Sequence, residues 1–230
     1  MLRPSLFAAL GVAIAVVAAT ATGADDKPSG VTVDKAKRLV IVPAKIAPRK
    51  LPHLDQVYPI EVIATWAYRE GKKGKAHETV VVTEVNPSEV HKALEAVGLK
   101  PGKPAVGEGT KADGPDVNVY IEVPQPDGTA RRFTMDKVLI DPKTKKPMPK
   151  SVKFKFTGSG MTQASPDKPD KVYGADLTGT LIAIFPVTDE TVMQTSLTMA
   201  EEKYLKLEVN KDVLPKEGDP VKLVLEVPGK

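Results

Sequence analysis

The sequence predicts an α+β protein that consists mostly of antiparallel β-strands and contains one well-defined helix. Short apolar segments rich in Val, Ile and Thr recur along the chain, and Gly- and Pro-containing turns separate them, which is typical of strands in an antiparallel sheet. One segment, at about 87–97, instead has apolar residues at helical spacing between a start and a stop signal. Because strands and helices do not alternate regularly, we expect the α+β class.

The N-terminus resembles a secretory signal peptide over residues 1–24. Arg3 precedes an apolar run over 6–19, and an A-x-A cleavage pattern follows at 19–21. This order is typical of an export signal, and the run is shorter than the ~20 residues that cross a bilayer. An uncleaved anchor is the alternative. We therefore expect a mature chain without a transmembrane segment, located in the periplasm or outside the cell.

The elements before the helix are predicted to be strands. "VTVD" and "RLVIVPAKI" flank a turn at 34–37 and predict a hairpin. "IEVIATWAY" alternates from Ile60 to Tyr68, which predicts one apolar face. In "HETVVVTEV" the run at 80–82 does not alternate, so we expect a central strand that is covered on both faces.

The helix at about 87–97 has signals at both ends. Asn86 is a good N-cap, Pro87 suits the first helical position, and Glu89 completes a capping-box spacing. Gly98 suits the left-handed stop. The apolar stripe consists of Val90, Ala93, Leu94 and Val97.

The second half is predicted to contain further strands after a Gly-, Pro- and Lys-rich loop at 100–116. We interpret 25–230 as a single domain; in a two-domain chain this loop would be the boundary. Strand patterns include "ARRFTMD" and "KVLID" over 130–141 and "VKLVLEV" near the C-terminus. Thr198 and Glu201 have capping-box spacing, which predicts a short second helix near 199–205.

Several sequence blocks resemble one bacterial family. They are "GKAHETVVVTEVNPSEVHKALEAVGLKPG" at 74–102, followed by "VYIEVPQPDGTARRF", "FTGSGM" and "YGADLTGTLIAIF". Their order from about 31 to 185 is similar to that of the YdjY domain family. The resemblance implies an exported setting and no established activity. The ferredoxin-like chemistry described for some members needs cysteine ligands, and this chain has no cysteine.

The first candidate site is a divalent metal site. It would use His77, Glu78 and His91, with His53 as a further ligand, because imidazole and carboxylate groups bind Zn and Fe. Adjacent strand residues point to opposite faces, so the first two converge only if a turn extends through them. The alternative is a structural role, in which His91 pairs with Glu95 one helical turn later.

Catalysis has weaker support in the sequence. Ser159 lies between two glycines, but no G-x-S-x-G motif, P-loop or dinucleotide fingerprint is present. The absence of cysteine excludes disulfides, thiolate nucleophiles and Cys-based zinc sites. The sequence leaves catalysis open, favours a protein without it, and predicts no cofactor apart from the alternative divalent metal.

The second candidate site is a basic stretch at 131–155. Only Asp136 and Asp141 oppose its cationic residues, which are Arg131, Arg132, Lys137, Lys143, Lys145, Lys146, Lys150, Lys153 and Lys155. If these side chains share a surface, they create a positive field. In an exported protein, the partner of Arg131, Arg132, Lys143, Lys145 and Lys146 would be an anionic envelope component. The alternative, which the sequence favours, is a lysine-rich hairpin that its charges keep soluble. With 5% aromatic residues, a nucleic-acid stacking platform is not expected.

The sequence therefore predicts an exported, non-catalytic binding or interaction module of the cell envelope. The alternative function is a metal- or ligand-binding protein, or an enzyme, that uses His77, Glu78 and His91.

Overall fold

The structure is a computed structural model that describes residues 30–51, 53–68, 74–167 and 169–229. The predicted signal peptide at 1–24 lies outside the described residues.

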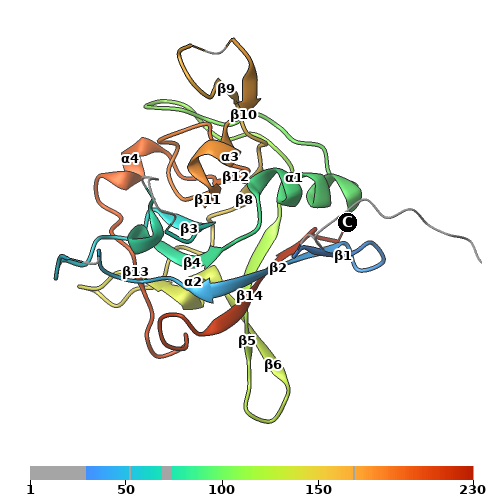
Figure 1. Ribbon diagram of the computed structural model, residues 1–230. Helices are drawn as coiled ribbons and strands as arrows, with labels where there is room; N and C mark the ends of the chain where they lie inside the picture. Colours follow the sequence, from blue (N-terminus) through green and yellow to red (C-terminus); the bar gives the residue numbers. More distant parts are fainter. Residues whose placement is uncertain (1–29, 52, 69–73, 168, 230) are drawn as a thin grey trace, which may run out of the picture.

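A ten-stranded mixed sheet forms the centre of the molecule (Figure 1). Its strands are β1 (Thr32–Asp34), β2 (Leu39–Ile46), β3 (Val62–Trp66), β4 (Thr79–Thr83), β5 (Asn118–Pro124), β6 (Ala130–Thr134), β8 (Phe154–Phe156), β11 (Thr180–Ala183), β12 (Met193–Thr195) and β14 (Pro220–Glu226). The order is β6-β5-β14-β2-β4-β3-β11-β12-β8, and β1 pairs with β2. Most pairs are antiparallel, while β3 with β4 and β11 with β12 are parallel. Strands from both sides of the 100–116 loop therefore lie in one sheet.

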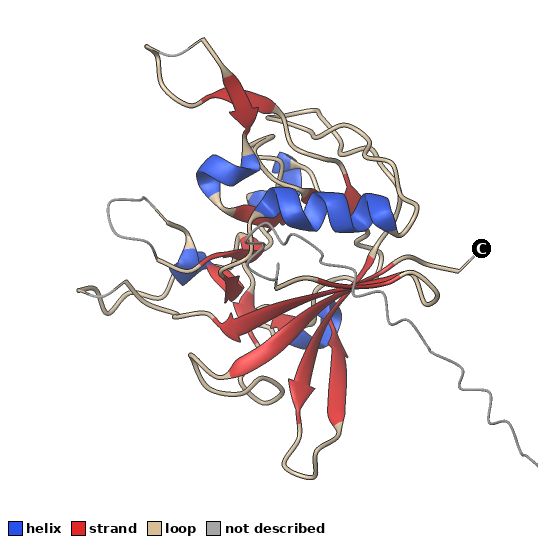
Figure 2. Ribbon diagram, turned by 45° about the vertical axis from the view of Figure 1, so that its right-hand side comes forward, coloured by secondary structure: helices blue, strands red, loops and turns tan. Residues whose placement is uncertain are grey.

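Smaller elements surround this sheet. Two short antiparallel pairs are β9 (Met161–Gln163) with β10 (Lys171–Tyr173), and β7 (Leu139–Ile140) with β13 (Glu208–Val209). The helices are α1 (Pro87–Ala96), the one-turn α2 (Met135–Val138), α3 (Ala175–Thr178) and α4 (Met199–Glu202), and the 3₁₀ helix η1 (Ala76–Glu78). Figure 2 shows α1 lying alongside the sheet rather than within it.

The α+β prediction is confirmed, and so are its clearest local elements. β1 and β2 form the predicted hairpin, with Asp34 opposite Leu39. β4 lies between β2 and β3, and all five of its residues are buried. At the end of α1, Gly98 has a φ of +91°, and the Leu99 amide donates to the Leu94 carbonyl at 3.2 Å. This is the left-handed helix stop that the sequence predicts.

Some predicted boundaries are wrong. "ARRFTMD" is not one strand, because β6 ends at Thr134 and α2 follows. The helical turn lets Met135 and Val138 both enter the core. In a strand, side chains alternate between the two faces, so one of these two residues would point away from the core. The helix expected at 199–205 is the single turn Met199–Glu202. β3 is buried at all five positions rather than on one face only. It lies in the interior of the sheet between β4 and β11, and other parts of the protein cover both of its faces.

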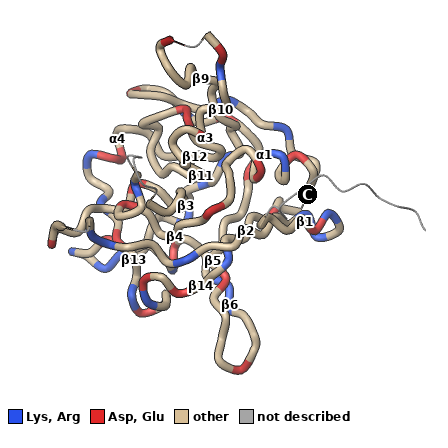
Figure 3. The backbone as a smooth tube through the Cα atoms, viewed as in Figure 1, with Lys and Arg blue, Asp and Glu red and all other residues tan. Residues whose placement is uncertain are grey.

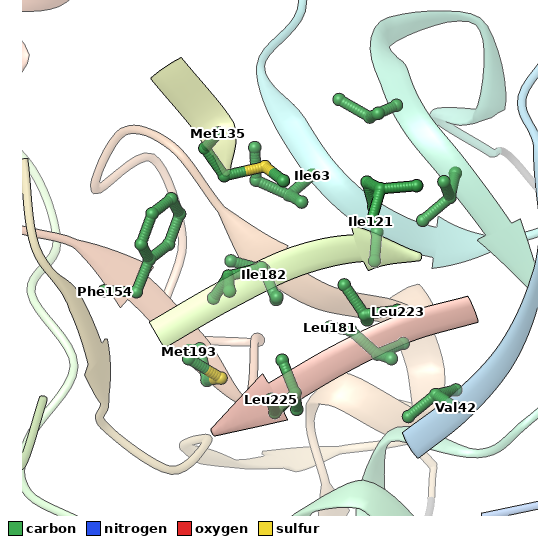
Figure 4. Packing of buried hydrophobic residues seen from close by; sticks show 14 of the residues in the cluster. Val42, Ile63, Ile121, Met135, Phe154, Leu181, Ile182, Met193, Leu223 and Leu225 are labelled. Carbon is green, nitrogen blue, oxygen red and sulfur yellow. The ribbon is translucent and has the colours of Figure 1, made fainter. Parts of the chain in front are cut away.

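The hydrophobic core lies against the sheet and connects its distant strands (Figure 4). Leu223 and Leu225 of β14, Ile121 of β5 and Ile182 of β11 are at most 1% exposed. At roughly 25 cal/mol per Å² of buried apolar surface, this continuous core is the main source of stability in a protein without disulfides. No helix in the described part of the chain has the length and apolar character needed to span a membrane.

Candidate functional site

His77 lies in a buried cluster at the start of β4. Its side chain belongs to η1, so the turn does extend through His77 and Glu78, and Nε2 and Oε1 are 3.4 Å apart. On the other side of the ring, Nδ1 lies 2.6 Å from the Tyr68 hydroxyl. Burial raises the pKa of Tyr68, so this phenol keeps its proton and shares a hydrogen bond with Nδ1. The imidazole is thus held between a phenol and a carboxylate.

Arg49 connects this cluster to the proline-containing loop before β3. Its guanidinium donates to the His77 carbonyl and to the Tyr58 carbonyl, both at 2.7 Å, and its amide donates to Glu217 at 3.0 Å. Burial lowers the pKa of Arg49, against the opposing effect of nearby carboxylates. Even so, an arginine at neutral pH keeps its charge. The ring of Tyr58 packs edge-on against that of His77 at 5.1 Å. Through these contacts Arg49 holds the loop before β3 against the start of β4, which is a structural role.

His91 lies in a second cluster, on the side of α1. Its Nδ1 is 2.8 Å from the Tyr173 hydroxyl, and its Nε2 is 3.6 Å from Glu95 Oε1. The ring packs edge-on against Phe156 at 5.0 Å. Burial lowers the pKa of His91, while Glu95 acts in the opposite direction. The predicted contact between His91 and Glu95 is present, and the half-buried imidazole is harder to protonate than a free one.

Ser159 belongs to the same cluster as His91. Its amide donates to the Tyr173 hydroxyl oxygen at 3.1 Å. Its hydroxyl donates to the Gly160 carbonyl at 3.0 Å and accepts from the Ala175 amide at 2.9 Å. Burial strongly raises the pKa of Tyr173, so that phenol keeps its proton and shares a hydrogen bond with His91 Nδ1. The Ser159 hydroxyl is committed to backbone groups, and it is the Ser159 amide, not the hydroxyl, that connects to His91 through Tyr173.

Three of the sequence blocks quoted above meet at this point. The Gly102 amide donates to the Phe156 carbonyl at 3.0 Å. A Cβ added to Gly158 would lie 2.9 Å from Pro101 Cβ and 3.4 Å from the His91 ring. "GLKPG", "FTGSGM" and "YGADL" therefore form one tight junction between α1 and the loops before β9 and α3.

The predicted metal ligands are only partly brought together. His77 and Glu78 are neighbours, whereas His91 has its own separate set of contacts with Tyr173, Glu95 and Phe156. His53 lies exposed in the loop between β2 and β3. Within the residues that the structure describes, no group of three or more His, Cys, Asp or Glu side chains could hold a metal ion.

Some cationic residues of the basic stretch contact carboxylates or an aromatic ring, and others have no ion pair among the described residues. Figure 3 shows basic positions on β6. Arg132 donates to Glu122 at 2.8 Å and approaches Glu226 at 3.7 Å, and Arg131 lies over the Phe133 ring at 4.8 Å. The tight turn that follows β7 is held by Asp141, which accepts backbone N–H groups at 2.8 Å. This turn exposes three lysines without an ion pair in the described ranges. They are Lys143, Lys145 and Lys146.

Two of the surface hollows formed by the described residues are large enough for a small ligand. The first, of about 550 Å³, lies between the start of β5, α2 and the segment 148–154, and we call it the lysine pocket. Its cationic residues are Lys137, Lys150 and Lys153. These lysines belong to the predicted basic stretch, but Asn118 and Tyr120, which also line the pocket, carry no sequence signal that would have identified them.

The second hollow is an apolar groove of about 890 Å³ between β2, β14 and the start of α1. Pro43, Val85 and Val221 contribute to its walls. Gly30, the first described residue, lies at its edge between Pro43 and Val85. Polar and charged side chains also line it, and they are Lys45, Thr83, Glu84, Asn86, Glu89 and Lys222.

Comparison with known proteins gives one match. The family model described as the YdjY domain matches residues 31–226, which is most of the chain and includes both clusters and all of the lysine pocket except Pro228. No curated protein and no solved structure matches the chain.

Proposed function

The chain belongs to the YdjY domain family, and from this premise we propose that it is an exported module that binds a partner without transforming it. Export is proposed from Arg3 and the apolar run at 6–19, which precede the family domain. The binding role is proposed from how the fold uses its reactive side chains.

One observation carries this proposal: the candidate catalytic groups serve the fold. His91 and Ser159 are both bonded to Tyr173, and the Ser159 hydroxyl also bonds two backbone groups. A nucleophilic serine instead needs a base within hydrogen-bond reach of its hydroxyl and an open side facing the substrate. Groups held in this way stabilise a junction between loops.

The partner that we propose is an anionic component of the cell envelope. Of the basic residues at 131–155, Lys143, Lys145 and Lys146 are exposed, and no ion pair neutralises them within the described part of the chain. Cations presented together attract polyanions, and this attraction decreases as salt screens it. Arg132 is already committed to Glu122, so we expect its contribution to be smaller.

The test is retention of the mature protein on a heparin resin at low salt, followed by elution with increasing salt. The turn variant carries Lys143→Gln, Lys145→Asn and Lys146→Gln; asparagine suits position 145, where φ is +58°. We expect this variant to elute at lower salt than the parent. The matched control neutralises three exposed lysines near α1 and should elute close to the parent. It carries Lys35→Gln, Lys92→Gln and Lys100→Gln.

No retention of the parent at low salt would contradict the proposal. The same conclusion follows if the turn variant and the control lose retention equally, since only net charge would then matter. Circular dichroism of each variant shows that the fold is retained.

A second candidate function is metal or ligand binding at His77. It is favoured by η1, which places His77 Nε2 beside Glu78 Oε1 at 3.4 Å. Its test is the metal content of the mature protein purified without chelator, alongside His77→Ala. Near-stoichiometric zinc or iron in the parent, and little in the variant, would establish this function. A metal-free parent protein would reject it.

A further inference from the structure

We propose that the lysine pocket binds a small anionic amphiphile, in which one acidic headgroup is attached to an apolar chain. This inference rests on the proposed function, because it specifies a ligand class for the same basic region. The pocket combines two features: an apolar floor and a cationic rim.

The floor of the lysine pocket is made of core side chains. Met135 and Met148 are 4% and 1% exposed, and Phe154 is 8% exposed. Met135 and Phe154 lie near β5 (Figure 4), whose Val119 also lines the pocket. Methionine side chains are flexible and polarisable and adapt to apolar ligands of different shape. Val152, which is half-buried, adds accessible apolar surface to this wall of the pocket.

The rim of the pocket keeps a net positive charge after its internal ion pairs are formed. Both acidic residues that line it already have lysine partners. Asp136 lies 4.0 Å from Lys150, and Asp116 lies 2.6 Å from Lys155, which is adjacent to the pocket. Two lining lysines remain, and neither has an ion pair among the residues that the structure describes. They are Lys137 and Lys153.

Neutral donors complete the rim. Asn118 and Tyr120 line the same side of the pocket from β5. Burial raises the pKa of Tyr120, and Glu226 adds to this effect. The phenol therefore stays protonated in neutral solution and can donate to an acidic headgroup. Thr134 is less available, because its hydroxyl is bonded to Asp136.

The size and shape of the pocket favour an amphiphile over a polymer. Its volume of about 550 Å³ lies within the range of roughly 300–1,000 Å³ that is usual for small-molecule sites. A polyanion would contact the rim and leave the apolar floor unused. An uncharged lipid would fill the floor and leave Lys137 and Lys153 without a partner.

The test is isothermal titration calorimetry of the mature protein with dodecyl phosphate, below its micelle-forming concentration and at low salt. Inorganic phosphate supplies the headgroup alone, and dodecanol supplies the chain alone. We expect dodecyl phosphate to bind more tightly than either. The pocket variant, Lys137→Gln with Lys153→Gln, should bind it about fivefold to tenfold more weakly, as expected for the loss of two partly exposed charge pairs.

The control is Lys143→Gln with Lys146→Gln, which changes the exposed turn and should leave the affinity for dodecyl phosphate unchanged. The inference is overturned if dodecyl phosphate does not bind, if dodecanol binds equally well, or if the pocket variant binds like the parent. Heparin retention is measured on the same variants. If heparin retention persists alongside any of these negative results, the proposed function stands and only the inference fails. If heparin retention is lost while dodecyl phosphate still binds, the proposed function fails and only the inference stands.

Discussion

The link between Tyr173 and its neighbours provides the sharpest test of whether the His91 cluster is structural. Tyr173→Phe removes one oxygen and changes little else. That oxygen accepts from the Ser159 amide at 3.1 Å and lies 2.8 Å from His91 Nδ1. Without it, a half-buried amide and an imidazole nitrogen lose their partners. A buried polar group left unpaired costs about 1–3 kcal/mol. Because this site is only partly buried, we expect a total loss of about 2 kcal/mol.

The assay is thermal and urea unfolding of the mature protein, followed by circular dichroism. For a chain of this size, a loss of about 2 kcal/mol lowers Tm by roughly 4–8 °C. Tyr204→Phe is the matched control, since Tyr204 is 71% exposed, and its stability should stay within about 0.5 kcal/mol of the parent. If Tyr173→Phe is as stable as this control, the phenol does not hold the junction. The His91 cluster would then need a functional explanation.

Three further predictions concern stability. Burial lowers the pKa of His91 in the folded protein; Lys92 adds to this effect and Glu95 opposes it. The neutral imidazole therefore contributes stability that is fully present above pH ~6.5 and is lost as pH falls through the lowered pKa. Between pH 7.5 and pH 5, the Tm of His91→Gln should change less than the Tm of the parent. Gly179→Ala should cost about 3 kcal/mol in urea unfolding, because φ is +75° and the new Cβ would lie 2.6 Å from the Trp66 ring; a loss below ~1 kcal/mol would contradict this. Glu122→Gln should cost about 1–2 kcal/mol at pH 7, because its carboxylate accepts from a lysine and an arginine that together lower its pKa. That difference should fade as pH falls through the lowered pKa, which salt-free unfolding at pH 7 and pH 3 would detect.

The elements that the sequence predicted correctly are those fixed by local chemistry. Asn86 and Gly98 determine the ends of α1 through backbone groups within one turn of the chain. The apolar run at 80–82 requires burial on both faces, and only a central strand provides it. The sequence does not reveal the α2 turn because Met135 and Val138 fall in two separate strand patterns, "ARRFTMD" and "KVLID". That both side chains enter the core three residues apart is known only from the fold.

The candidate sites were less predictable because they join distant residues. His91 and Tyr173 are 82 positions apart, and neither residue type predicts the other. Tyr120 and Lys153 line the same pocket although more than thirty residues separate them along the chain. Lysines can be counted in a sequence, but which of them keep their charge unpaired depends on which carboxylates the fold brings to them. Asp116 neutralises Lys155, and this pairing requires the contact between the end of the 100–116 loop and β8.

Two of the recognisable blocks, "GLKPG" and "FTGSGM", supply none of the residues that line the lysine pocket, whereas a third supplies Val119 and Tyr120. The separation of the first two from the pocket has a physical reason. "GLKPG" and "FTGSGM" meet where Gly102 and Gly158 leave no room for a Cβ. Such close packing restricts residue identity strongly, so these blocks are distinctive because they build the fold. A surface that holds a partner by charge restricts identity weakly, since lysines at several positions create the same field. Function in this chain is therefore best sought at Lys137, Lys153 and the exposed turn, where the fold leaves charges unpaired.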